Sequence, residues 1–212
     1  MTDREISRRD WLRRAARTGA SIAAVGGLGW ALHGRRLPDP ASTVVPGPVF
    51  PDWSVPDQAP RLAIVTGRDR VRTLERSLAA LGGIERFIRP GDRVVVKPNI
   101  GFAIPAELGA TSHPDVVGAL VRQCLAAGAV SVVVTDNPVN DPDSTFALTG
   151  IAQAARDAGA RVVLPRGDRF RNATLQGATL LRDWPILTGP FEDATKVIGL
   201  CRSEEHTSEL QS

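Results

Sequence analysis

The stretch RVVVKPNIGFAIPAELGATSHP, residues 93–114, decides the fold. Valines 94–96 are β-branched, and a short apolar run of this kind predicts a strand that is buried on both faces. Pro98 has no backbone N–H, so strand pairing is expected to end there. Lys97 and Asn99 are therefore expected at the carboxyl end of a strand, which is the edge where open α/β sheets bind ligands.

The lysine in this stretch is unusual for the chain, which has 26 basic residues and only two lysines, Lys97 and Lys196. One interpretation is a strand-end lysine that extends into water. The other is an anchor for a bound anion. Further polar residues in the same stretch strengthen the second interpretation and leave both open: Asn99, Thr111, Ser112 and His113.

The rest of the chain predicts alternating strands and helices. Strands are expected at residues 62–65, 94–96, 131–135, 161–164 and 196–200. Helices are expected at residues 70–81, 114–127 and 145–158. Ser112 is the expected N-cap of the second helix, with Pro114 in its first turn. Residues 166–190 predict a short hairpin or an irregular excursion.

This order predicts an α/β fold, with a mainly parallel sheet and helices on both faces. The carboxyl edge would then present Lys97, Asn99, His113 and Asp136 together, since Asp136 follows the strand at 131–135. Free N–H groups after Ser112 would favour an anion.

The bulk composition is that of an ordinary globular chain of 212 residues, 42% hydrophobic and 23% charged. Its net charge is uneven: +4 over residues 1–40, −2 over 202–212 and +1 over the remainder. The nearly neutral middle gives nucleic-acid binding little electrostatic support. Cys124 and Cys201 are the two cysteines, too few for a zinc site, a disulfide framework or a cysteine-held iron–sulfur cluster.

Residues 1–34 resemble a twin-arginine export signal, in which Arg8 and Arg9 precede a weakly apolar segment at 15–32. This predicts export to the periplasm through the twin-arginine machinery, with membrane contact limited to this segment. The segment is expected to be a cleaved signal or an uncleaved anchor; a basic amphipathic helix on a surface is the alternative. A proline-rich linker is expected at 35–60, with Trp53 either docked on the domain or without a role.

The last residues, RSEEHTSELQS at 202–212, resemble the translation of a sequencing-adapter read-through. We therefore expect a partial, C-terminally truncated α/β domain at residues 61–201, followed by an artefact.

The KPN motif at 97–99, the TSHP motif at 111–114 and the VVVTDNP motif at 132–138 occur in this order. Together they resemble the bacterial domain-of-unknown-function 362 family. The resemblance covers residues 61–200, and its matched positions include Lys97, Asn99, Ser112, His113 and Asp136. Members often bear an iron–sulfur label, and some relatives carry ferredoxin-like cysteine motifs that this chain lacks.

Two functional hypotheses follow. The first is an exported enzyme or cofactor-binding domain, in which Lys97, Asn99, Thr111 and Ser112 bind an anion. His113 would move a proton, while Asp136 would bind a metal, orient His113 or accept a substrate hydroxyl. The alternative roles are a capping-region histidine and an Asx-turn aspartate without chemistry. The second hypothesis is a non-catalytic exported subunit of a binding or redox complex.

Overall fold

The computed structural model describes residues 8–34, 50–55, 62–174 and 182–201. The chain divides into two compact units, Met1–Thr43 and Val44–Ser212. Helix α1 (Arg8–Gly34) belongs to the first unit. Several of its apolar side chains are exposed: Ile22, Val25, Leu28 and Trp30. No helix in the described ranges combines the length and the apolar character of a membrane span.

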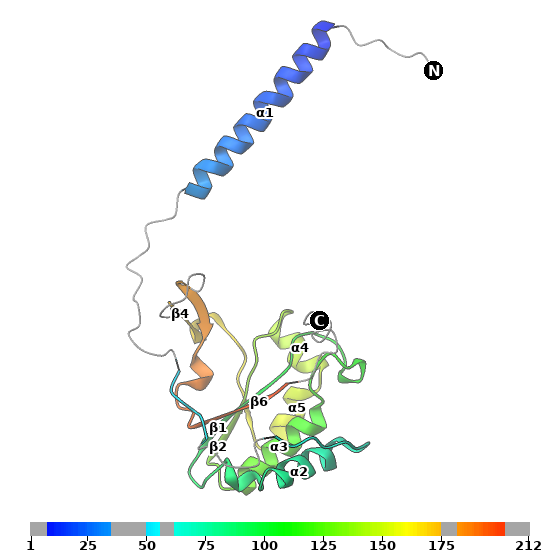
Figure 1. Cartoon of the computed structure of the whole chain (residues 1–212), viewed down its shortest axis with the longest axis vertical. Coiled ribbons are helices and arrows are strands. Elements are labelled where there is room, and N and C mark those ends of the chain that lie inside the picture. Colours follow the sequence, from blue (N-terminus) through cyan, green and yellow to red (C-terminus); the bar gives the residue numbers. More distant parts are fainter. Residues whose placement is uncertain (1–7, 35–49, 56–61, 175–181, 202–212) are drawn as a thin grey trace. The chain divides into compact units, whose positions relative to one another are not determined.

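Four parallel strands form the main sheet of the second unit, in the order β3-β2-β1-β6 (Figure 1). They are β1 (Arg93–Pro98), β2 (Ser131–Val134), β3 (Arg161–Val162) and β6 (Lys196–Leu200). Val95 pairs with Val133 on one side and with Val197 on the other. The α/β fold with a parallel sheet is thus confirmed, and β1 ends at Pro98 as its missing N–H predicted.

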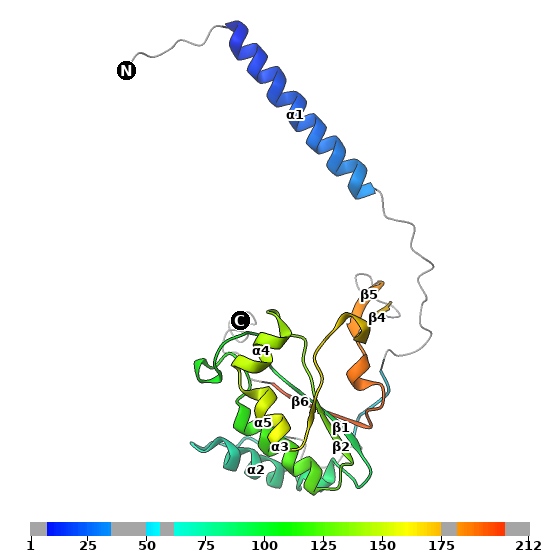
Figure 2. The same ribbon diagram turned by 180° about the vertical axis from the view of Figure 1, so that it is seen from behind.

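The α-helices of the second unit pack over one face of this sheet, not over both as expected (Figures 1 and 2). They are α2 (Arg70–Ala80), α3 (Pro114–Ala126), α4 (Pro142–Leu148) and α5 (Ile151–Asp157). Val94, Val96 and Val134 point into this layer and join one core cluster with Leu120 and Cys124 of α3. Fully burying one such side chain stabilises the fold by about 1.5–3 kcal/mol.

The opposite face carries a smaller core, because successive strand side chains point to opposite sides. Val95, Val133 and Val163 form it, and Phe191 packs against them. Phe191 ends the 3-10 helix η4 (Gly189–Phe191), which contributes to the cover of this face.

The region from 166 to 190 contains an antiparallel hairpin, which confirms one of its two interpretations. Its strands are β4 (Phe170–Ala173) and β5 (Trp184–Leu187). Trp53 docks on the domain: its indole N–H donates to the carbonyl of Ala194 at 3.0 Å. This tryptophan therefore has a structural role.

The strand expected at residues 62–65 is absent, which is a correction. Leu62 and Ile64 are 75% and 84% exposed, and the segment is not paired in either sheet. A strand needs a hydrogen-bonded neighbour, and β6 takes the place beside β1. An apolar pattern alone therefore misled the prediction.

The single helix expected at 145–158 is two helices, α4 and α5, separated at Gly150. Gly150 has a φ of 71°, the left-handed conformation that glycine adopts without a Cβ penalty. The hydroxyl of Thr149 bonds back to the carbonyl of Thr145 at 2.9 Å and completes the end of α4. The glycine therefore acts as a helix break.

Candidate functional site at the carboxyl edge of the sheet

Lys97 and Asp136 form the centre of the candidate site. Lys97 lies near the end of β1, Asp136 follows β2, and the ammonium nitrogen is 2.7 Å from Oδ1 of the carboxylate. The other oxygen, Oδ2, accepts the backbone N–H of Ile100 at 2.7 Å. The Asp136 side chain is only 7% exposed, whereas that of Lys97 is 53% exposed. The buried carboxylate is therefore satisfied, and it holds an ammonium that still faces water.

Hydrogen bonds between Asn99 and Ser112 connect the start of the loop that follows β1 with the end of the same loop. The Ser112 hydroxyl accepts the Asn99 N–H at 2.9 Å and donates to the Leu200 carbonyl at 2.7 Å. The Ser112 N–H donates to the Asn99 carbonyl at 2.8 Å. These bonds place the loop beside the carboxyl ends of both β1 and β6.

Ser112 is not the N-cap of α3, which corrects the prediction. His113 is the cap, and its Nδ1 accepts the Asp115 N–H at 3.3 Å. The serine hydroxyl is already used by Asn99 and Leu200, so the next side chain caps the helix. Because Nδ1 accepts a hydrogen bond, the neutral ring carries its proton on Nε2.

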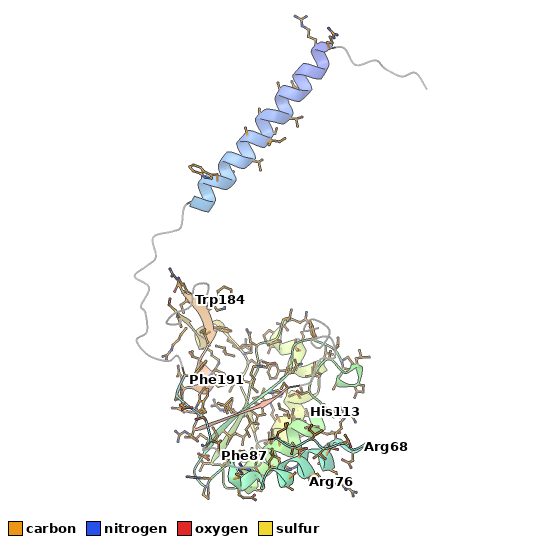
Figure 3. The ribbon with its side chains drawn as sticks, viewed as in Figure 1. Arg68, Arg76, Phe87, His113, Trp184 and Phe191 are labelled. Carbon is orange, nitrogen blue, oxygen red and sulfur yellow. The ribbon has the colours of Figure 1, made fainter. Side chains whose placement is uncertain are left out.

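The first turn of α3 has fewer free backbone N–H groups for an anion than we expected. The Asp115 N–H is used by the His113 ring, and the N–H groups of Val116 and Val117 donate to the His113 carbonyl. His113 is on the helical side of the domain (Figure 3). An anion at this edge would therefore depend mainly on side chains.

Thr111 is a predicted site residue whose hydroxyl lacks a hydrogen-bond partner among the described residues. It is fully buried, and its hydroxyl oxygen has no hydrogen-bond partner in the described part of the chain. Asn99, by contrast, uses its side-chain oxygen to accept the Gly101 N–H at 3.2 Å. Buried polar groups are nearly always paired, so Thr111 marks a place where a partner is wanted.

Sequence reasoning missed the backbone groups that complete the site. The Ile100 N–H and the Leu200 carbonyl belong to residues with apolar side chains, and nothing in the sequence marks them. No group of three or more His, Cys, Asp or Glu side chains within the described ranges could hold a metal ion.

The remaining predicted pair, Arg8 and Arg9, begins helix α1, and both residues are exposed. They belong to the first unit, apart from the α/β domain.

The comparisons with known proteins bear on the second unit. The family described as Domain of unknown function (DUF362) matches residues 94–209, which include Lys97, Asn99, Ser112 and Asp136. The match runs into 202–212, which lie outside the described residues, so the expected read-through and truncation stay predictions. No curated protein and no solved structure matches the chain significantly. Because the matched range exceeds half of the sequence, this chain belongs to the DUF362 family.

Proposed function

We propose that this DUF362 domain binds an anionic small molecule at the carboxyl edge of its sheet, with Lys97 as the anchor. The observation that carries the proposal is the contact of Lys97 with the buried carboxylate of Asp136. An ammonium has three N–H donors, and this contact leaves donors free on a side chain that is half exposed. The ion pair thus orients the lysine without using up its capacity to bind.

The ligand class follows from the chemistry of a lysine. An ammonium is a compact point charge that suits phosphate and carboxylate groups. The buried hydroxyl of Thr111 and the side-chain NH2 of Asn99 are its proposed polar partners from the same loop. One N–H of that NH2 group donates to the Ala110 carbonyl at 3.5 Å, and the other is left for the ligand. Asp136 acts as a positioning residue, because both of its oxygens already have donors.

The ring of His113 favours a binding module without catalysis over an enzyme at this site. That ring caps α3 through Nδ1 and leaves only Nε2 for chemistry. With Asp136 engaged as well, no free acid–base pair exists among the predicted site residues. Cys124 does not suit an iron–sulfur cluster either, because burial raises the pKa of its thiol to about 12 and disfavours a thiolate ligand.

The test of the anion site starts with the 212-residue chain and a thermal-shift panel of phosphorylated and carboxylated metabolites. A charge-assisted bond contributes about 1.5–3 kcal/mol, so Lys97→Met should weaken the best hit about tenfold to a hundredfold. Lys196→Met, which changes the other lysine, is the matched control and should leave the affinity unchanged. Equal affinities for Lys97→Met and the parent would reject the site.

Export through the twin-arginine machinery is our proposal for localisation. It is supported by the exposed pair Arg8 and Arg9 at the start of α1 and by the apolar side chains that follow. Changing both to lysine should keep the protein in the cytoplasm, as measured by cell fractionation. The pair at 35–36 offers a matched control that should still be exported. Export of the 8–9 double variant would contradict the proposal.

A further inference from the structure

A hollow of about 460 Å³ lies beside the β4–β5 hairpin and shares no lining residue with the site at Lys97. This volume is within the range of small-molecule sites, about 300–1,000 Å³. Phe191, which lines the hollow, and Trp184 of β5 in the hairpin are shown in Figure 3. Nothing in the anion-binding proposal uses this hollow.

The apolar wall of the hollow is held firmly to the domain. The ring centroids of Phe50 and Phe191 are 5.4 Å apart in an edge-to-face arrangement. Trp53 contacts both rings and is itself fixed by its hydrogen bond to Ala194. The two phenylalanines therefore form a built aromatic surface on which an apolar group can pack.

The polar wall offers both signs of charge. Arg171 pairs with Glu192, and their side chains are 70% and 48% exposed. Because water screens exposed ion pairs, this pair can open at little cost. A guanidinium beside a carboxylate is the complement of a molecule that carries one carboxylate and one ammonium.

A third observation points to a missing partner at the same place. Thr188 lines the hollow and is 7% exposed, yet its buried hydroxyl oxygen has no hydrogen-bond partner in the described residues. Such a group is rare in a folded protein and calls for a donor or acceptor from a ligand or water.

We infer that this hollow binds a free α-amino acid with an aromatic or other apolar side chain. The ligand's carboxylate lies on Arg171, its ammonium on Glu192, and its side chain on Phe50 and Phe191. The hydroxyl of Thr188, which is buried in the wall of the hollow, gives a further hydrogen bond when it turns toward the ligand.

The test is isothermal titration calorimetry of the 212-residue chain with three related probes. L-Phenylalanine carries both charges, 3-phenylpropionate lacks the ammonium, and phenethylamine lacks the carboxylate. Phenylalanine should bind at least about tenfold more tightly than either of the others. Failure of phenylalanine to bind, or equal binding of all three probes, would overturn the inference.

Variants then locate the bound probe. Arg171→Gln should weaken phenylalanine binding about tenfold or more. Arg166→Gln breaks a comparable exposed ion pair, with Asp143, and should change nothing. Lys97→Met should also leave this binding intact, which separates the two sites. Should Arg171→Gln fail to fold, methyl NMR of the parent decides: phenylalanine should shift the Ala173 methyl signal, and an unmoved signal would overturn the assignment.

Discussion

The two ends of strand β1 use similar polar groups for different purposes. At the amino end, Asp92 accepts the Arg89 N–H and the Thr195 hydroxyl, both at 2.7 Å, and Thr195 in turn accepts the Arg93 N–H at 2.9 Å. At the carboxyl end, Asp136 accepts the Ile100 N–H and the ammonium of Lys97. Each end thus joins a carboxylate to the strand ladder through neutral donors. Among the residues that the structure describes, only those at the carboxyl end add a side-chain cation in direct contact with that carboxylate.

The difference shows how one strand can be anchored at one end and available for binding at the other. The donors around Asp92 are a backbone N–H and a hydroxyl group, which are committed to Asp92 and to the Arg93 carbonyl. The donors around Asp136 include an ammonium whose remaining N–H groups face water. A ligand can approach that ammonium without breaking the strand pairing.

Among substitutions at the two ends of β1, Asp136→Ala should lower the free energy of unfolding the most. It leaves the Ile100 N–H unpaired in the interior, which costs about 1–3 kcal/mol of unfolding free energy. Urea unfolding followed by circular dichroism measures the loss. Asp136→Asn retains an acceptor and should recover part of it. An Ala variant as stable as the parent would show that the carboxylate is not a structural anchor.

Two hydroxyl deletions compare the ends directly. Ser112→Ala removes the bridge between Asn99 and Leu200, and Thr195→Val removes the bridge between Asp92 and Arg93. Each should lower the unfolding free energy by about 1–2 kcal/mol.

The affinity for the anion should differ between Ser112→Ala and Thr195→Val. Only Ser112→Ala disturbs the loop beside Lys97, so only it should weaken the ligand found in the thermal-shift panel. Equal affinities in the two variants would remove the functional distinction between the ends.

The pH dependence of stability should report the amino end. Burial alone would raise the pKa of Asp92, but hydrogen bonds from Arg89 and Thr195, helped by nearby Lys196, hold it below its usual value of 3.8. A depressed pKa adds stability that is present above the unfolded-state value and is lost as pH falls through the folded-state value. The parent should therefore exceed Asp92→Asn in unfolding free energy near pH 6, and the gap should close below about pH 4. A constant gap would contradict this assignment.

Thiol labelling tests the core next to β1 without any substitution. Cys124 lies in the core between α3 and the sheet, and its pKa is raised to about 12 by burial, whereas Cys201 is exposed just after β6. One thiol should react with a disulfide reagent at pH 8 in the native protein, and two should react after denaturation. Rapid reaction of both native thiols would show that the core next to β1 is open.

Much of the fold was predictable because its signals are local. The valine runs of β1 and β2, the stripe of α3 and the apolar segment of β6 were each recognised within a few residues. Leu62–Val65 carried the same kind of signal and still formed no strand, because a strand also depends on a partner. Gly150 was not recognised as a break, because a lone glycine is often tolerated in a helix.

The candidate site was predictable in part. The sequence predicted Lys97, Asn99, His113 and Asp136 together at the carboxyl edge. Lys97 and Asp136 do form an ion pair there, whereas His113 caps α3. Which hydrogen-bond partner each one meets was not predictable, since Ser112 and its acceptor Leu200 are 88 residues apart in sequence. The Asp92–Thr195 bridge, which spans 103 residues, was missed for the same reason.

A phosphate titration followed by backbone amide NMR of the 212-residue chain tests the central claim most directly. Inorganic phosphate should shift the amide signals of Asn99, Ile100 and Gly101, next to Lys97, in a saturable way. The amides of Arg93 and Thr195, at the amino end of the same strand pair, should stay in place. Unchanged signals around Lys97, or equal shifts at both ends, would contradict an anion site at the carboxyl edge.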